Sequence, residues 1–175
     1  MHIVAYATDV ATIVGMKTLV KPAALADIRK PQGCTNLKLR QLTRRVTQYY
    51  DAEVGKTGLK ITQYSLLSHV VKLGPIRAVD LAVAMRVSTS TLSRNLQPLI
   101  AAGWIVVNSG DDARSRLISA TEAGQTKRTE AQRKWRIAQE GINATLGAER
   151  VVALHALIDE SLELLAPLDA DDEEA

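Results

Sequence analysis

The stretch that decides the fold runs from Ile76 to Thr121 and reads IRAVDLAVAMRVSTSTLSRNLQPLIAAGWIVVNSGDDARSRLISAT. It predicts two short helices joined by a tight turn, followed by a two-stranded hairpin. Ser88 is a favourable N-cap for the second helix, because its hydroxyl can accept a hydrogen bond from an otherwise unpaired backbone N–H. One face of that helix is apolar, with leucines at i, i+4 and i+7: Leu92, Leu96 and Leu99.

The opposite face of this helix carries hydroxyls and longer polar side chains, which is typical of a helix that reads base edges in DNA. Short hydroxyls let a helix lie deep in the major groove, and Arg94 can form two hydrogen bonds to guanine. The alternative for this helix alone is a solvated face on an ordinary helical hairpin. The expected base readers are Ser88, Thr89, Ser90, Ser93, Arg94 and Gln97.

The segment after Gly103 favours DNA binding over a plain helical hairpin. Residues 104–108 (WIVVN) are strand-like, residues 109–112 form a turn, and residues 117–121 return as the partner strand. Such a hairpin can act as a wing that reaches a neighbouring minor groove. The expected wing contacts are Arg114, oriented by a salt bridge from Asp112, and Arg116. Around the first helix, the expected phosphate contacts are Arg77 and Arg86.

Together these motifs resemble the winged helix-turn-helix of the MarR family of bacterial transcription regulators. The reader helix and first strand (STSTLSRNLQPLIAAGWI), the wing (DARSRLISAT) and the TEAG that follows carry the resemblance. It extends to CTNLKLRQLTRRVTQYYD at residues 34–51 and GLKITQYSLL at residues 58–67. The chain departs from the family pattern at residues 109–111, where many members carry a further Asp and Arg.

The resemblance covers about residues 34–165 and implies a mainly α fold with a small β-wing. The implied organisation is a winged DNA-binding lobe at residues 58–121 and a helical dimerisation region at residues 34–57 and 122–166. An N-terminal extension of unclear role (residues 1–33) and an acidic tail (residues 167–175) remain outside it. Either the extension covers a partner subunit or it comes from an upstream translation start.

Helices are expected over residues 35–54, over a segment that Thr62 can N-cap, over residues 122–145 and over residues 148–165. The last of these has an apolar stripe near heptad spacing, which must pack within the monomer or against a second subunit. In the family the first and last helices interlock, so the resemblance favours a homodimer. Two reader helices about one DNA turn apart match a palindromic operator.

Composition sets further bounds on the function. The chain has 175 residues, 46% of them hydrophobic, and a formal charge of +3. Five of the last seven residues are acidic, so the rest of the chain is clearly basic, which suits a polyanionic partner. The apolar part of residues 3–20 is interrupted by Asp9 and Lys17, too broken for a transmembrane helix. No membrane partner is expected.

No motif predicts catalysis. The single cysteine excludes an internal disulfide and favours a reducing cytoplasm. The sequence has no CxxC, HExxH, glycine-rich phosphate loop or nucleophile elbow, so we expect no catalytic residues, cofactor or metal. A small enzyme is therefore disfavoured. The other alternative, a winged helix that binds only proteins, predicts a neutral or acidic reader face.

Two inputs are conceivable for such a regulator. Cys34 is either a small half-buried residue or a redox switch, because a thiol at a helix start oxidises more readily and some MarR-family proteins sense oxidants in this way. The resemblance also implies a small aromatic acid or phenol bound between the DNA-binding lobe and the dimer helices. The candidate ligand contacts, each also a plausible core or surface residue, are Tyr49, Tyr64, His69 and Trp135.

Overall fold

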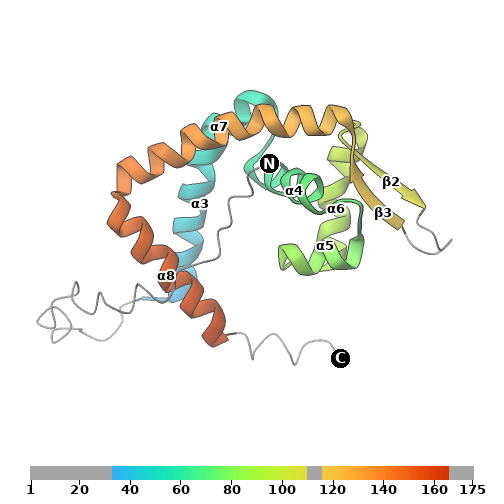
Figure 1. Ribbon diagram of the computed structural model, residues 1–175. Helices are drawn as coiled ribbons and strands as arrows, with labels where there is room; N and C mark the ends of the chain where they lie inside the picture. The colour runs from blue at the N-terminus through green and yellow to red at the C-terminus, as the bar shows by residue number, and fades with distance from the viewer. Residues whose placement is uncertain (1–32, 110–115, 166–175) are drawn as a thin grey trace, which may run out of the picture. The chain divides into compact units, whose positions relative to one another are not determined.

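The computed structural model describes residues 33–109 and 116–165 of the chain. Its helices are α3 (Thr35–Val54), the 3-10 turn η1 (Gly55–Thr57), α4 (Ile61–Leu73), α5 (Ala78–Met85), α6 (Thr89–Ala101), α7 (Glu122–Leu146) and α8 (Ala148–Leu165). Its strands are β1 (Ile76–Arg77), β2 (Ile105–Ser109) and β3 (Arg116–Ala120) (Figure 1). The predicted class, mainly α with a small β-wing, is confirmed.

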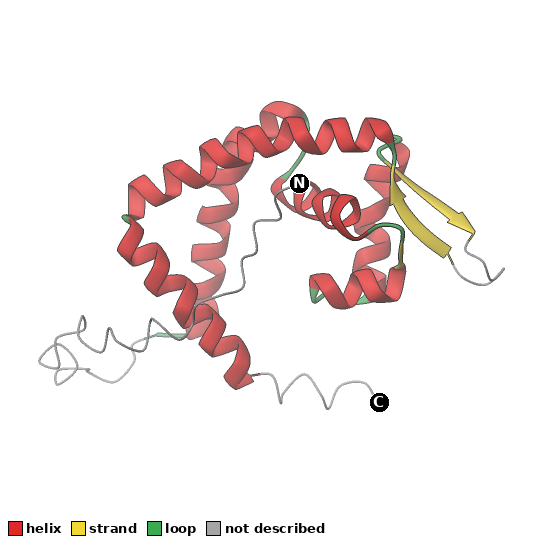
Figure 2. Cartoon of the chain, viewed as in Figure 1, coloured by secondary structure: helices red, strands yellow, loops and turns green. Residues whose placement is uncertain are grey.

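The chain divides into two compact units, residues 1–41 and residues 42–175. The described part of the first unit is the start of α3. The second unit holds all of the remaining elements, and its strands lie together beside α6 and the start of α7 (Figure 2). None of the helices within the described ranges is long and apolar enough to cross a membrane.

The helix-turn-helix forms as the sequence predicts. Ser88 caps α6, and its Oγ accepts a hydrogen bond from the Thr91 amide at 3.2 Å. The three leucines of the apolar face, Leu92, Leu96 and Leu99, are all buried in the core. The turn depends on Arg86, a non-glycine residue with φ of 52°, which ends α5 in the left-handed region.

The residues at the end of α6 explain where the helix stops. The helix continues through Pro98 to Ala101, because a proline there removes only one backbone hydrogen bond. Gly103 follows with φ of +72°, a conformation that glycine adopts at little cost. The chain then turns into β2.

The sheet has three strands rather than the predicted two. β1 pairs antiparallel with β3 through Ile76 and Ile118, so the strand order is β1-β3-β2. β2 begins and ends one residue later than predicted, and β3 begins and ends one residue earlier. Ser109 pairs with Arg116 instead of entering the turn. Thr121 leaves the strand because it caps α7.

The predicted N-cap of α4 is wrong. Thr62 does not cap this helix but lies inside it, and the N-cap residue is Lys60. The first amide of the helix, that of Ile61, donates instead to Asp51 Oδ1 in α3 at 2.7 Å. A carboxylate from another helix therefore takes the place of a local hydroxyl cap.

The TEAG motif joins the wing to α7. The Thr121 hydroxyl donates to the Gly103 carbonyl at 2.7 Å and accepts from the Gly124 amide at 3.0 Å. A Cβ at Gly124 would lie 2.0 Å from the carbonyl oxygen of Trp104. This close approach explains why glycine follows the cap, since any side chain would force the helix away from the strand.

Candidate nucleic-acid interface

The polar face of α6 is open to solvent. Thr89, Ser90, Ser93, Arg94 and Gln97 are all exposed, opposite the buried leucines. Arg94 takes part in none of the ion pairs found within the described residues. The helix therefore presents hydroxyls, an amide and one uncompensated cation on a single side, which is the chemistry needed to contact base edges.

Ser88 differs from the other expected readers. Its Oγ accepts from the Thr91 amide and lies 2.9 Å from Thr91 Oγ1 and 3.0 Å from Ser90 Oγ. The hydroxyl is thus engaged in the cap and in a local network. Its geometry favours a positioning role for Ser88, which fixes the start of α6, over a free donor aimed at DNA.

The two arginines that flank α5 have different surroundings. Arg77 forms a two-point ion pair with Asp80, with Nε–Oδ2 and Nη2–Oδ1 distances of 2.7 and 3.0 Å. The hydrogen bond and the charge of Asp80 raise the pKa of Arg77, and the same hydrogen bond lowers the pKa of Asp80. Arg86 is exposed and has no such partner among the described residues. Arg86 is therefore the freer of the two cations.

The wing is described only at its base. Arg116 is exposed at the start of β3. The other two expected wing contacts, Asp112 and Arg114, lie outside the described residues, as do the N-terminal extension through residue 32 and the acidic tail.

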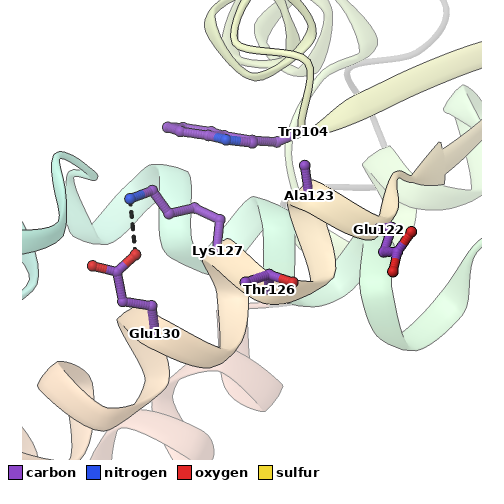
Figure 3. A pocket seen from close by; sticks show the side chains of 6 residues that line it. All are labelled: Trp104, Glu122, Ala123, Thr126, Lys127 and Glu130. Atoms are coloured by element: carbon purple, nitrogen blue, oxygen red, sulfur yellow. Dashed lines mark hydrogen bonds and ion pairs between the residues drawn. The ribbon is translucent and has the colours of Figure 1, made fainter.

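A cavity of about 460 Å³ lies where the wing meets α7, and Figure 3 shows six of its side chains. Lys127 lies over the Trp104 ring, 5.5 Å from its centroid, and pairs with Glu130 at 2.9 Å. The ammonium group already has an aromatic face and a carboxylate as partners. Because its one cation is already engaged, this cavity is unsuited to binding a polyanion.

Three of the four candidate ligand contacts line one cavity of about 360 Å³. Tyr64 and Trp135 lie with ring centroids 6.3 Å apart, and His69 hydrogen-bonds through Nδ1 to the Ser65 carbonyl at 2.8 Å. The hydroxyl of Ser68, also at this cavity, has no hydrogen-bond partner among the residues that the structure describes. An aromatic wall next to an unpaired hydroxyl can hold a small aromatic molecule that carries a polar group.

The fourth candidate, Tyr49, does not line that cavity. Its hydroxyl lies against Gly141 of α7, and its neighbour Tyr50 lines the cavity instead. Tyr50 also donates a hydrogen bond to Gln139, and burial raises its pKa.

Cys34 is exposed in the first unit, directly before α3. Its carbonyl accepts a hydrogen bond from the Lys38 amide at 3.2 Å, so it belongs to the first helical turn. The expectation of a half-buried residue is wrong, because the side chain is open to solvent. Its redox role stays a prediction.

Comparisons with known proteins show which family this architecture resembles. The MarR family model matches residues 57–115, which include the helix-turn-helix and β2, the first strand of the wing. The M. tuberculosis transcriptional regulator MosR, solved in complex with DNA, is 28% identical with a TM-score of 0.61, over 74% of this chain and 98% of MosR. The chain thus carries a MarR-family helix-turn-helix.

More distant matches agree with this assignment. The S. aureus MepR–DNA complex has a TM-score of 0.67 at 17% identity, over 77% of this chain and 100% of MepR, and this likeness concerns the fold. The uncharacterised HTH-type transcriptional regulator YwoH of Bacillus subtilis is 24% identical over 90 residues, 51% of this chain and 66% of YwoH, slightly under two thirds. MarR-family proteins are transcription regulators and not enzymes, which confirms the expectation that this chain has no catalytic role.

Proposed function

We propose that this chain is a MarR-family homodimer that binds a specific DNA operator and represses transcription until a small aromatic ligand or oxidation releases it. The observation that carries the proposal is the polar face of α6. The four side chains Ser90, Ser93, Arg94 and Gln97 are exposed together, on a helix whose start is fixed by the Ser88 cap. Such a regulator acts on chromosomal DNA in the cytoplasm.

The dimer is supported by the surface of α8. Among its residues only Val151 is buried, whereas Leu157, Leu162 and Leu165 are 61%, 47% and 56% exposed. A stripe of this length is costly to leave in water, at roughly 25 cal/mol for each Å² of apolar surface. We propose that a second copy covers it and so sets two α6 helices about one DNA turn apart.

The dimer is tested by sedimentation of the wild type and of Leu162→Glu. The wild type is expected to sediment as a dimer and the charged variant as a folded monomer, because a carboxylate would be buried without a partner at the interface. Glu163→Leu, at an exposed position beside the stripe, is the matched control. A monomeric wild type would contradict the dimer and leave a single reader helix.

Release by a ligand rests on the cavity beside Tyr50. Its aromatic wall (Tyr64 and Trp135) suits a ring, and the unpaired Ser68 hydroxyl can bind a carboxylate or phenol. Oxidation of Cys34 is the alternative input. Fluorescence anisotropy of bound DNA, followed while aromatic acids, phenols or peroxide are added, separates the two.

The central experiment compares a labelled duplex from upstream of the chain's own gene with a scrambled duplex. Tighter binding to the native fragment that weakens as salt rises is expected. Arg94→Ala should cost about 1–3 kcal/mol on the native fragment, roughly 5–150-fold in Kd. Arg133→Ala, at an exposed position in the middle of α7, is the control and should bind as the wild type does.

Equal affinity for both duplexes would refute sequence-specific reading at that fragment. If the wild type bound neither duplex at low salt, the winged helix would serve a protein partner instead.

A further inference from the structure

A groove lies on one flank of α6, between that helix and the start of α4. Its volume is about 240 Å³, and buried Leu66 forms part of its lining. The rest of its lining comes from both helices. These residues are Lys60, the N-cap of α4, with Thr62 and Gln63 of α4, and Arg94, Asn95 and Pro98 of α6.

The groove has positive charge without a counter-ion. Its lining includes two cations, Lys60 and Arg94, and no carboxylate. Ion pairs in residues 33–109 and 116–165 join other groups (Lys56 with Glu53, the Arg77 pair and the Lys127 pair). Both groove cations are exposed. The charge is therefore available to an anion, beside the face that we propose to contact bases.

The start of α4 does not itself provide the binding site. The carboxylate of Asp51 already accepts the first amide of the helix, and the Lys60 amide donates to Gln63 Oε1 at 2.9 Å. Attraction must therefore come from the two cationic side chains, helped by the amide nitrogens of Gln63 and Asn95 as donors. This arrangement also keeps the Lys60 backbone fixed while its ammonium group stays free.

We propose that this groove binds one phosphate of the DNA backbone, with Lys60 as its anchor. The proposal rests on the DNA-binding function proposed above and adds a contact that fixes the position of α6 without reading sequence. Lysine suits this role because its ammonium is a compact charge on a flexible stem. Arg94, on the other side of the groove, can then contact either the same phosphate or a base edge.

The contact makes a prediction that base reading does not. Neutralising a phosphate contact releases counter-ions, so the logarithm of affinity changes with the logarithm of salt with a slope of about −0.9 per phosphate. A dimer has two Lys60 residues. Lys60→Gln should therefore reduce the slope by about 1.8 per dimer and should weaken binding to native and scrambled duplexes by the same factor, about tenfold or more near 0.1 M salt.

The test is anisotropy with fluorescein-labelled duplexes of about 20 base pairs, two helical turns, at several salt concentrations. Because a phosphate contact is independent of sequence, the salt slope can be measured on the scrambled duplex, and the native fragment is included to compare the two losses of affinity. Lys60→Arg should keep the wild-type slope. Lys72→Gln is the matched control, because Lys72 is exposed at the far end of the same helix, about 18 Å away along its axis.

Each outcome decides between the two proposals. An unchanged slope in Lys60→Gln, with normal wild-type binding, overturns the phosphate contact and leaves the proposed function intact. A loss confined to the native duplex makes Lys60 a base reader and also overturns it. A wild-type chain that binds neither duplex overturns both. Thermal unfolding checks that Lys60→Gln is folded, and Lys60→Met is a second neutral variant with a similar stem.

Discussion

Thr121→Val tests how the wing is joined to α7. The substitution keeps the branched shape of the side chain and removes the hydroxyl, with its hydrogen bonds to the Gly103 carbonyl and from the Gly124 amide. Loss of an N-cap costs about 1 kcal/mol, and loss of the second hydrogen bond about 0.5–1.5 kcal/mol. Because Thr121 is only half-buried, water can replace part of both, and we expect a loss of about 1–2 kcal/mol in the free energy of unfolding.

The assay is urea unfolding at one fixed protein concentration, because a dimer's stability depends on concentration. In a thermal scan the same loss corresponds to a decrease in Tm of about 2–8 °C. Thr129→Val is the matched control on the same helix. Its hydroxyl donates only to the Gln125 carbonyl one turn earlier, so its removal should change the free energy by less than about 0.5 kcal/mol.

Equal unfolding midpoints for the two valine variants would refute this reasoning. They would mean that the Thr121 hydroxyl adds no more than an ordinary bond back along a helix. A changed urea dependence in Thr121→Val alone would instead indicate that the wing detaches before the remainder of the chain unfolds.

Three further predictions concern other parts of the molecule. Gly124→Ala should destabilise the chain by about 1–3 kcal/mol, because overpacking against the Trp104 carbonyl outweighs the gain of about 1 kcal/mol from alanine in a helix. A neutral result in urea unfolding would contradict the close contact. Burial raises the pKa of Tyr50, so the folded chain disfavours the phenolate, and its stability should fall as the pH rises above about 10; this fall should be smaller in Tyr50→Phe, as measured by unfolding at several pH values. If Cys34 senses oxidants, peroxide should lower the DNA affinity of the wild type but not of Cys34→Ser; the same peroxide response in both would exclude the thiol.

The helix-turn-helix was predictable from sequence because its signals are local. The Ser88 cap, the leucines at helical spacing and Gly103 lie within the segment that they shape. The last helix was predicted with the bounds that the structure shows, since Gly147 separates it from α7. In such segments propensity, pattern and turn chemistry agree.

The remaining features depend on contacts between distant residues. β1 has two residues, too few for a hydrophobic pattern, and it forms only because Ile76 meets Ile118 of β3. The partner of the first α4 amide is Asp51, ten residues earlier in another helix. The Lys60–Arg94 groove likewise joins residues that are far apart in the sequence, and no local spacing marks it.

The length of α7 has a mechanical consequence. It has 25 residues, so it is about 37 Å long, and its first turn is fixed to the wing through Thr121 while its last turn leads into α8. A rigid helix that is joined to other elements at both ends acts as a lever. A rotation of about 5° about one end moves the other end by roughly 3 Å over that length. In the proposed dimer, a ligand that binds beside Trp135, in the middle of α7, would need to tilt this helix only slightly. Such a tilt would change the distance between the two reader helices and so their match to the operator.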